Sequence, residues 1–194
     1  MRVRCIETTG ANLSLEQKKM GYHENVHFPI TIGSSYVVYG MTLWAGHIWY
    51  LISGDHKQFP EWMPDDLFAV SDSKLSKHWH YKKNQSELAN PIQGTWGYKE
   101  LTSDLHADEL TDNDLEALEV FNIYKELMDL EFADPENSVT AKAADYQNWV
   151  ICAICDEAWE VFSDSGRVRC PNCRSILNNP LHTKTNKLLG SGAK

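Results

Sequence analysis

The sequence predicts an α+β protein with a small antiparallel β barrel first, amphipathic helices in the centre, and a cysteine-bearing β hairpin last. Three observations lead to this prediction. Short runs of strand-forming residues alternate with turn residues between positions 26 and 82. An apolar period of three and four residues replaces them after Thr111. Two C-x-x-C pairs then follow, Cys152 with Cys155 and Cys170 with Cys173.

The expected strands are rich in β-branched and aromatic residues, and each is followed by Gly, Asp or Ser. They cover Val26–Ile32, Tyr36–Tyr39, His47–Ile52 and Leu67–Val70. Gly40 follows the second of them, where a bulge or sharp bend would suit. Short strands at intervals of about ten residues are typical of a small antiparallel barrel or sandwich.

Several strings in this part are also similar to a known class. Gly33–Gly40, Trp49–Ile52, and Trp62–Pro64 followed by Leu67 and Phe68 resemble the SH3-like small barrels of uncharacterised bacterial proteins. The resemblance implies a barrel domain over residues 1–83. Such a fold does not name a function by itself.

A linker and an acidic helical segment are expected over residues 84–149, because Asn90, Pro91 and Gly94 interrupt any regular pattern at its start. Thr111 has the chemistry of an N-cap for a helix from about Asp112 to Glu131. Asp134 and Pro135 indicate the start of a second helix. The face that this second helix would bury consists of Val139, Ala143, Tyr146 and Trp149.

The charge of the chain is concentrated in the same segment. The net charge is −9, yet Ser86 to Trp149 alone holds three basic and fifteen acidic residues. An acidic surface repels a phosphate backbone and attracts a basic partner. The sequence therefore predicts a basic protein partner that binds the acidic helices between Asp104 and Glu136.

The two cysteine pairs are the strongest chemical signal. Two thiolates on each of two tight turns, fourteen residues apart, match a four-thiolate zinc site with Cys152, Cys155, Cys170 and Cys173 as ligands. Ala158–Phe162 and Arg167–Arg169 are expected to form a hairpin between the turns, joined by Ser163–Gly166. Residues 150–182 thus resemble a zinc ribbon, and residues 183–194 are expected to form a frayed tail.

The metal site favours a structural role. Four cysteines leave no open position for water, so one Zn²⁺ per chain would stabilise the fold rather than catalyse a reaction. Iron is chemically possible in such a site, whereas a thioredoxin-like redox pair lacks its βαβ context. Cys5 is left over, and we expect it to be a small buried apolar side chain.

Three classes of function remain open. The first is a non-enzymatic interaction protein, similar in charge and size to bacterial immunity proteins that neutralise basic toxins. The second is a zinc ribbon associated with nucleic acid, which the weakly basic last 45 residues make less favoured. The third is an enzyme with a site between barrel and helices. Phosphate-binding and nucleophile motifs are missing from the sequence, so no catalytic residue is assigned.

The sequence also bears on the compartment. No apolar run approaches the roughly 20 residues of a membrane span, and Met1 to Ile6 lacks an apolar signal region. Five cysteines, four of them in metal-binding spacing, do not suggest a disulfide framework. We therefore expect a cytoplasmic protein without membrane contact.

Overall fold

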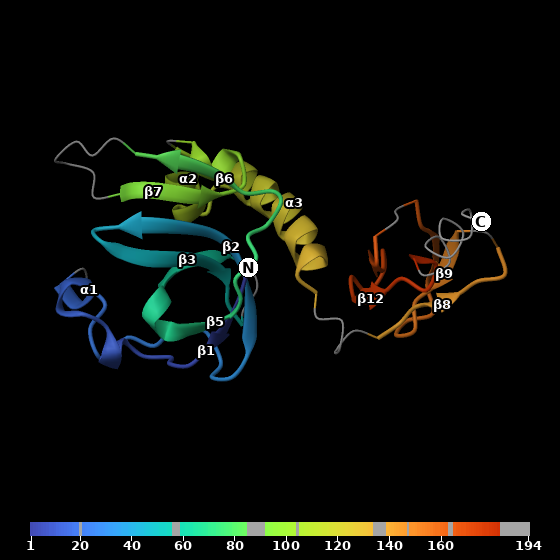
Figure 1. Cartoon of the computed structure of the whole chain (residues 1–194), viewed down its shortest axis with the longest axis horizontal. Coiled ribbons are helices and arrows are strands. Elements are labelled where there is room, and N and C mark those ends of the chain that lie inside the picture. The colour runs from blue at the N-terminus through green and yellow to red at the C-terminus, as the bar shows by residue number, and fades with distance from the viewer. Residues whose placement is uncertain are drawn as a thin grey trace, which may run out of the picture. The chain divides into compact units, whose positions relative to one another are not determined.

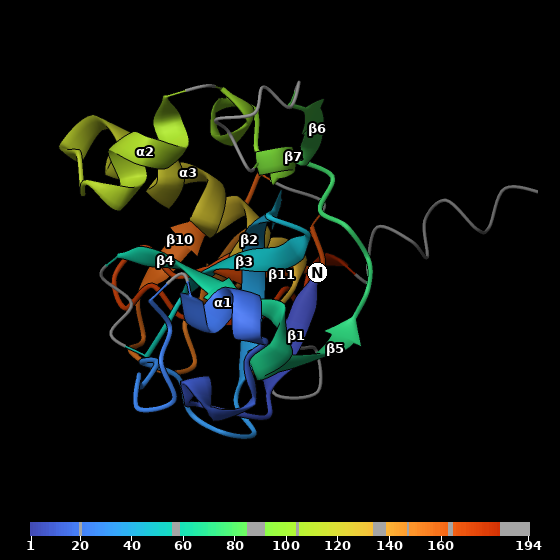
Figure 2. The same ribbon diagram turned by 90° about the vertical axis from the view of Figure 1, so that its left-hand side faces the viewer.

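The computed structural model describes residues 1–19, 21–55, 59–84, 92–103, 105–133, 139–146, 148–162 and 165–182. The chain forms two compact units, Met1–Asp129 and Leu130–Lys194. Figures 1 and 2 show the ribbon from two directions. Each unit is described by itself below. No helix in the described part of the chain is both long and apolar enough to cross a membrane.

The N-terminal unit is built on one antiparallel sheet of seven strands. The main path runs β4-β3-β2-β1-β5, and β7 adds to β2 and carries β6 on its other side. Figure 1 shows β6 and β7 alongside β2 and β3. The strands are β1 (Arg2–Cys5), β2 (Ser35–Trp44), β3 (His47–Ser53), β4 (Pro60–Pro64), β5 (Phe68–Asp72), β6 (His80–Lys83) and β7 (Ile92–Gly97).

The long strand β2 connects the two parts of this sheet. Its first residues, Ser35 to Val37, pair with β1, and its second half from Gly40 onward pairs with β7. A bulge lies between Val38 and Gly40 on the side that faces β3. The bend that the sequence predicts beside Gly40 is therefore confirmed.

Two glycines on facing strands make room for one leucine. Gly40 in β2 is the register partner of Gly97 in β7. A Cβ atom added to Gly40 would lie 2.2 Å from Leu101 Cδ2, and one added to Gly97 would lie 2.4 Å from the same atom. Leu101 is 1% exposed, so it seals the sheet where neither strand carries a side chain.

Short helices complete the unit. The α-helices are α1 (Leu15–Lys19), α2 (His106–Thr111) and α3 (Leu115–Glu131), and the 3₁₀ turns are η1 (Gly10–Asn12), η2 (Asp65–Leu67) and η3 (Glu100–Thr102). Helix α3 is fixed to the sheet by Tyr39. The ring of Tyr39 meets Phe121 edge to face at 5.3 Å, and its hydroxyl donates to Asp129 Oδ1 at 2.7 Å.

The expected barrel is wrong, because the sheet does not close. The linker expected before α2 contains β7, which pairs along the second half of β2 and extends the sheet instead. The strand expected over Val26–Ile32 is also wrong. In that range only His27 forms a bridge, an isolated one to Thr9. The linker residues Asn90 and Pro91 lie outside the described residues.

The central helices differ from the expectation in number and start. Thr111 ends α2 rather than capping the next helix, and Asn113 turns the chain with a φ of 59°. Asp114 is the cap of α3, since its Oδ1 accepts from the N–H of Ala117 at 3.0 Å. Helix α2 was thus not predicted, and α3 begins three residues later than expected.

The second expected helix is wrong where it can be tested. Its proposed start, Asp134–Pro135, lies outside the described residues. Ala143, however, belongs to a strand, and Tyr146 is 77% exposed rather than packed in a helix face. The alternation of the chain around Val150 favours a strand that buries one side chain in two.

The C-terminal unit contains two small antiparallel sheets. One has the order β10-β9-β8 and the other pairs β11 with β12. The strands are β8 (Lys142–Ala143), β9 (Trp149–Ile151), β10 (Ala158–Glu160), β11 (Arg167–Arg169) and β12 (Ile176–Asn178). Their small core consists of Ala141, Val150, Cys152, Val168, Cys170 and Leu177.

The expected pairing of Ala158–Phe162 with Arg167–Arg169 is therefore wrong. Strand β10 pairs with β9, and β11 pairs with β12, so each hairpin closes across one cysteine pair. A metal-binding turn reverses the chain tightly enough to serve as the hairpin loop. Phe162, the last residue of the expected strand, lies beyond β10 and is 86% exposed. Ser163 and Asp164 lie outside the described residues.

Candidate metal centre

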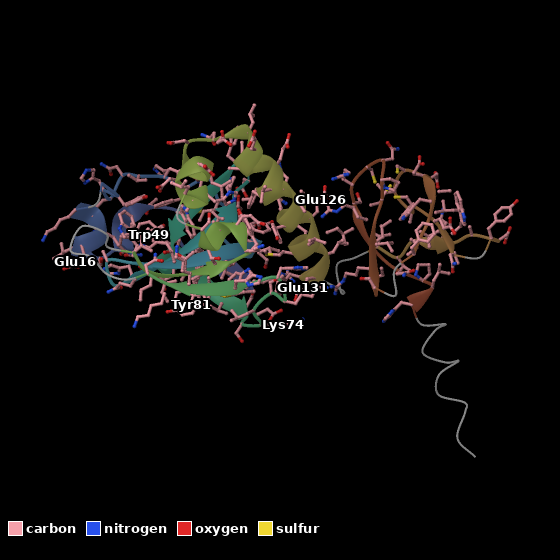
Figure 3. The ribbon with its side chains drawn as sticks, turned by 90° about the horizontal axis from the view of Figure 1, so that it is seen from above. Glu16, Trp49, Lys74, Tyr81, Glu126 and Glu131 are labelled. Atoms are coloured by element: carbon pink, nitrogen blue, oxygen red, sulfur yellow. The ribbon has the colours of Figure 1, made fainter. Side chains whose placement is uncertain are left out.

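Each cysteine pair occupies the loop of one hairpin. Cys152 to Cys155 joins β9 to β10, and Cys170 to Cys173 joins β11 to β12. The sulfur atoms of this unit, drawn in yellow, gather together in Figure 3. The strands thus bring together two turns that are far apart in sequence.

The first turn is held by two backbone hydrogen bonds. The N–H of Cys152 donates to the carbonyl of Glu157 at 2.7 Å. The N–H of Asp156 donates to the carbonyl of Cys152 at 3.1 Å. Asp156 reverses the chain in the left-handed region, with a φ of 58°. Asp tolerates this region better than most residues with a side chain.

The second turn repeats the same pattern. The N–H of Cys170 donates to the carbonyl of Ser175 at 3.0 Å, and that of Arg174 donates to the carbonyl of Cys170 at 3.1 Å. Arg174 adopts a φ of 62° and takes the place that Asp156 has in the first turn. The two turns are therefore equivalent in backbone structure although they share only their cysteines.

The sulfur positions fit one tetrahedral ion. All four Sγ atoms lie within 4.8 Å of one another. Across the two turns, Cys152 Sγ is 3.7 Å from Cys173 Sγ, and Cys155 Sγ is 3.5 Å from Cys170 Sγ. Zinc–sulfur bonds of about 2.3 Å in a tetrahedron place neighbouring sulfurs about 3.8 Å apart. The arrangement is thus already close to what one ion would impose.

Polar groups around the sulfurs suit thiolates. The N–H of Ile154 donates to Cys152 Sγ at 3.4 Å, and the amide Nδ2 of Asn172 donates to Cys155 Sγ at 3.7 Å. Ser175 Oγ lies 3.3 Å from Cys173 Sγ. Donors directed at ligand sulfurs disperse their negative charge and fix their orientation.

Burial divides the four ligands into an inner and an outer pair. Cys152 and Cys170 are fully buried, Cys155 is partly buried and Cys173 is exposed. Burial raises the pKa of the Cys170 thiol, whereas hydrogen bonds with Ser175 lower the pKa of Cys173. The thiolate of Cys173 therefore forms more readily than that of Cys170, which a bound cation would hold ionised.

The residues present fit a bound metal ion. Four sulfur donors complete a tetrahedral shell by themselves, so the site is closed and leaves no position for water or substrate. Among the described residues, no other group of three or more His, Cys, Asp or Glu has ligand atoms this close together. The fifth cysteine, Cys5, is 1% exposed in the N-terminal unit, and burial raises the pKa of its thiol. That agrees with the small buried side chain that the sequence predicts.

Sequence reasoning identified the four cysteines but missed what holds the turns. Asp156 and Arg174 are not glycines, so the positive φ angles gave no signal in the sequence. The sequence likewise does not indicate that the side chain of Asn172 donates to a ligand sulfur. A search of protein-family models, of curated proteins and of solved structures finds no match to this chain, so the resemblance of residues 26–82 to SH3-like barrels gains no support from it.

Proposed function

We propose that the C-terminal unit is a zinc ribbon with one structural Zn²⁺ bound by Cys152, Cys155, Cys170 and Cys173. The observation that carries this proposal is the spacing of the sulfurs across the two turns, 3.5 and 3.7 Å. Zinc is favoured over iron because the site is closed and redox-silent zinc is the usual occupant of structural four-cysteine sites. Reduced thiolates also support a cytoplasmic location.

Elemental analysis of the purified chain tests the metal directly. We expect one zinc per chain, lost in Cys170→Ser and retained in Cys5→Ser, which alters a buried thiol of the other unit. Iron at one equivalent would replace zinc in the proposal. A folded C-terminal unit with no metal in the wild-type protein would refute the site.

We also propose that the chain is a non-enzymatic interaction protein whose acidic helices bind a basic protein. The chain around the starts of α2 and α3 supports this proposal, because exposed acidic residues and exposed leucines occur close together in sequence there. Leu105 is 67% exposed and Leu115 is 77% exposed. Charge directs the approach of a partner, and apolar contacts then hold it. The exposed acidic residues are Asp108, Glu109, Asp112, Asp114, Glu116 and Glu119.

Charge reversal distinguishes this surface from the others. The tagged chain is compared with Glu116→Lys/Glu119→Lys and with Glu16→Lys, an exposed acid on α1 that serves as the matched control. We expect one basic protein to be retained by the wild type and the control with nanomolar, salt-sensitive affinity. The double variant should lose it. Equal retention by all three proteins would remove the acidic surface from the proposal.

An immunity-type role, in which the basic partner is a toxin, is the finer form of the same proposal. The relation of the N-terminal unit to SH3-like small barrels is likewise proposed. It concerns the order of the strands β4-β3-β2-β1-β5 in an open sheet and not a closed barrel. Neither proposal depends on the identity of the metal.

A nucleic-acid role is the second candidate, and exposed aromatic side chains favour it. Tyr146 and Phe162 are 77% and 86% exposed in the C-terminal unit, which also carries Arg167 and Arg169. Exposed rings offer stacking platforms for unpaired bases. Binding of a labelled single-stranded oligonucleotide at low salt, weakened by Phe162→Ala, would favour this role. No binding at low salt would exclude it.

A further inference from the structure

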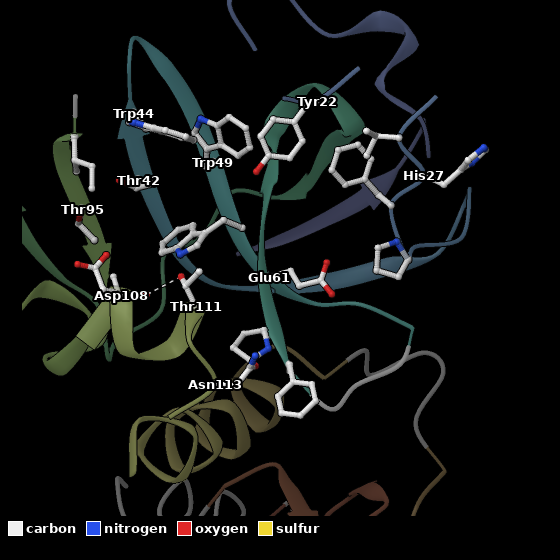
Figure 4. Close-up of a pocket in the computed structure, with 18 residues that line it drawn as sticks. Tyr22, His27, Thr42, Trp44, Trp49, Glu61, Thr95, Asp108, Thr111 and Asn113 are labelled. Carbon is white, nitrogen blue, oxygen red and sulfur yellow. Dashed lines mark hydrogen bonds between the residues drawn. The ribbon is translucent and has the colours of Figure 1, made fainter. Parts of the chain in front are cut away.

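A cavity of about 670 Å³ opens in the N-terminal unit, which does not contain the metal site; of the acidic helix surface it includes only Asp108. Its walls come from the chain before β2, from the sheet strands β2, β3, β4 and β7, and from α2. Figure 4 shows the lining side chains, with Glu61 on the side nearer His27, and Asp108 and Thr111 on the opposite side. The volume falls within the range of small-molecule sites, about 300–1,000 Å³.

Aromatic rings form one continuous wall of this cavity. The ring centroids of Trp44 and Trp49 are 5.2 Å apart, and those of Trp49 and Tyr22 are 5.0 Å apart. Tyr22 in turn stacks on Phe28 at 6.0 Å. Trp62 and Phe59 line the cavity as well. The site therefore presents π-electron faces, which carry partial negative charge.

The charged groups of the lining have one sign. Glu61 on β4 and Asp108 on α2 are carboxylates, and the lining contains no Lys or Arg. His27 is its one residue that could become positive. The carboxylate of Glu61 is close enough to Tyr22 to add, after burial, to the rise in pKa of that phenol. The electrostatic field of the cavity is thus negative from both its rings and its acids.

The lining also contains a polar group without a partner. Trp49 is 0% exposed, and its Nε1–H has no hydrogen-bond acceptor within the described part of the chain. A buried donor left unpaired is destabilising by about 1–3 kcal/mol. Thr42, by contrast, satisfies its hydroxyl by donating to the carbonyl of Gly94 at 3.2 Å. Since none of Trp49 is exposed, this donor lies behind the cavity wall, and the accessible rings are those of Trp44, Tyr22 and Trp62.

We propose that this cavity binds an organic cation, an alkylated ammonium or a guanidinium group. Aromatic faces attract such cations through the ring quadrupole, and tryptophan does so most strongly. A carboxylate on each side of the lining, Glu61 or Asp108, offers a counter-charge that offsets the desolvation of the cation. Anions are repelled by the same groups, and a purely apolar ligand would leave Glu61 and Asp108 without a counter-charge.

The inference stands apart from the metal site and does not require a partner for the acidic helices. The cationic group could belong to a free small molecule or to the side chain of a basic protein. The surface position of Asp108 on α2 makes either source sterically accessible. The two sources are separated by the choice of probe.

Choline is the first probe, and 3,3-dimethyl-1-butanol is its neutral isostere, with carbon in place of the quaternary nitrogen. Binding to the full-length protein is followed by tryptophan fluorescence and by the indole N–H resonances. We expect saturable binding of choline with a dissociation constant in the millimolar range or tighter. The neutral isostere should bind roughly 3- to 30-fold more weakly, as expected for a cation–π contribution.

Isosteric charge removal locates the site. Glu61→Gln and Asp108→Asn change exposed side chains, so the fold is retained. Each should weaken choline several-fold and leave the neutral isostere unchanged. Glu16→Gln, on α1 (Figure 3), is the matched control and should bind like the wild type. Equal binding by all four proteins would place the cation elsewhere and overturn the proposal.

The second probe is Nα-acetyl-arginine methylamide, compared with its neutral citrulline analogue. Preference for choline assigns the site to a small quaternary ammonium compound, and preference for the arginine derivative assigns it to a basic protein side chain. Equal affinity for each cation and its neutral isostere, or the absence of binding by both cations, would refute the inference. Loss of choline binding leaves the proposed protein partner untouched, since that test is made on Glu116 and Glu119.

Discussion

The two units of this chain are stabilised in different ways. The N-terminal unit buries large side chains, among them Trp49, Tyr98 and Phe121, between a seven-stranded sheet and its helices. The C-terminal unit has strands of two or three residues, and two of its six core residues are cysteines at the metal site. A core this small rarely stabilises a fold without a metal or disulfides. One chain thus combines a unit whose apolar core is large enough to stabilise its fold with a unit whose fold depends on a metal ion.

Metal removal should have the largest effect on stability, and it should affect only one of the two units. A zinc chelator is expected to unfold the C-terminal unit, because the binding energy of a structural zinc is on the order of 10 kcal/mol. The N-terminal unit should stay folded. Hydrogen exchange resolved by segment measures both, with protection lost around Val150 and Val168 and kept in β2 and β3. Restored protection on adding zinc is the control, and simultaneous loss in both units would break the comparison.

A large-to-small change in the N-terminal core should produce the opposite pattern. Phe121→Ala removes a ring that is 2% exposed and meets Tyr39, so it should cost about 3–5 kcal/mol of unfolding free energy. Zinc content should remain at its wild-type value. Phe162→Ala, which truncates a ring that is 86% exposed, is the matched control and should change stability little. Loss of zinc from Phe121→Ala would contradict the independence of the units.

Acidification should weaken the N-terminal unit by a smaller amount through His106. Its Nε2 lies 2.9 Å from the hydroxyl of buried Tyr98, and burial lowers the pKa of His106 below its ordinary 6.5. The folded unit therefore resists protonation that the unfolded chain accepts. Stability is complete above pH 6.5 and falls as the pH drops from 6.5 toward the lowered pKa.

His106→Asn tests this dependence by hydrogen exchange of β2 amides between pH 7.5 and 5. The variant should lose the part of the pH dependence that His106 supplies, whatever its stability at neutral pH. Glu109 opposes the effect, since its carboxylate raises the pKa of His106. An unchanged slope in the variant would show that His106 is protonated equally in both states.

The smallest expected effect concerns the second metal turn. Arg174 adopts a φ of 62°, which glycine accepts without a steric penalty. Arg174→Gly should therefore tighten zinc binding slightly, by at most about 1 kcal/mol because the unfolded chain also gains freedom. Competition with a chelator measures the affinity. Asp156→Gly is the equivalent change in the first turn, and markedly weaker binding in both variants would mean that their side chains stabilise the site.

Prediction from the sequence was most accurate for elements whose structure is determined by residues close together in the chain. The cysteine pairs specify their own turns, and Tyr36–Tyr39 and His47–Ile52 are β-rich in themselves, so β2 and β3 were located correctly. Strand β7 was mistaken for a linker because Asn90, Pro91 and Gly94 interrupt the regular pattern before and within it. The role of Gly94 depends on a residue far away in the sequence, because a Cβ there would lie 3.1 Å from the Tyr81 ring.

Errors in the candidate sites have the same origin. The aromatic cavity combines residues from Tyr22 to Asn113, and no spacing along the chain indicates that they meet. Nothing in the sequence indicates that Trp44 and Trp62 line the same cavity. The hairpin pairing failed because the cysteine turns themselves close the hairpins, which frees β10 and β11 from each other.

The packing of Leu101 over Gly40 and Gly97 has a consequence for how this sequence can diverge. A methyl group at either glycine would occupy the space of Leu101 Cδ2. The three positions therefore form one steric unit, in which any gain of volume on the strands has to be matched by a loss at position 101. Related sequences with alanine at position 40 or 97 should carry a smaller residue at 101, so correlated variation among these positions would identify descendants of the same sheet.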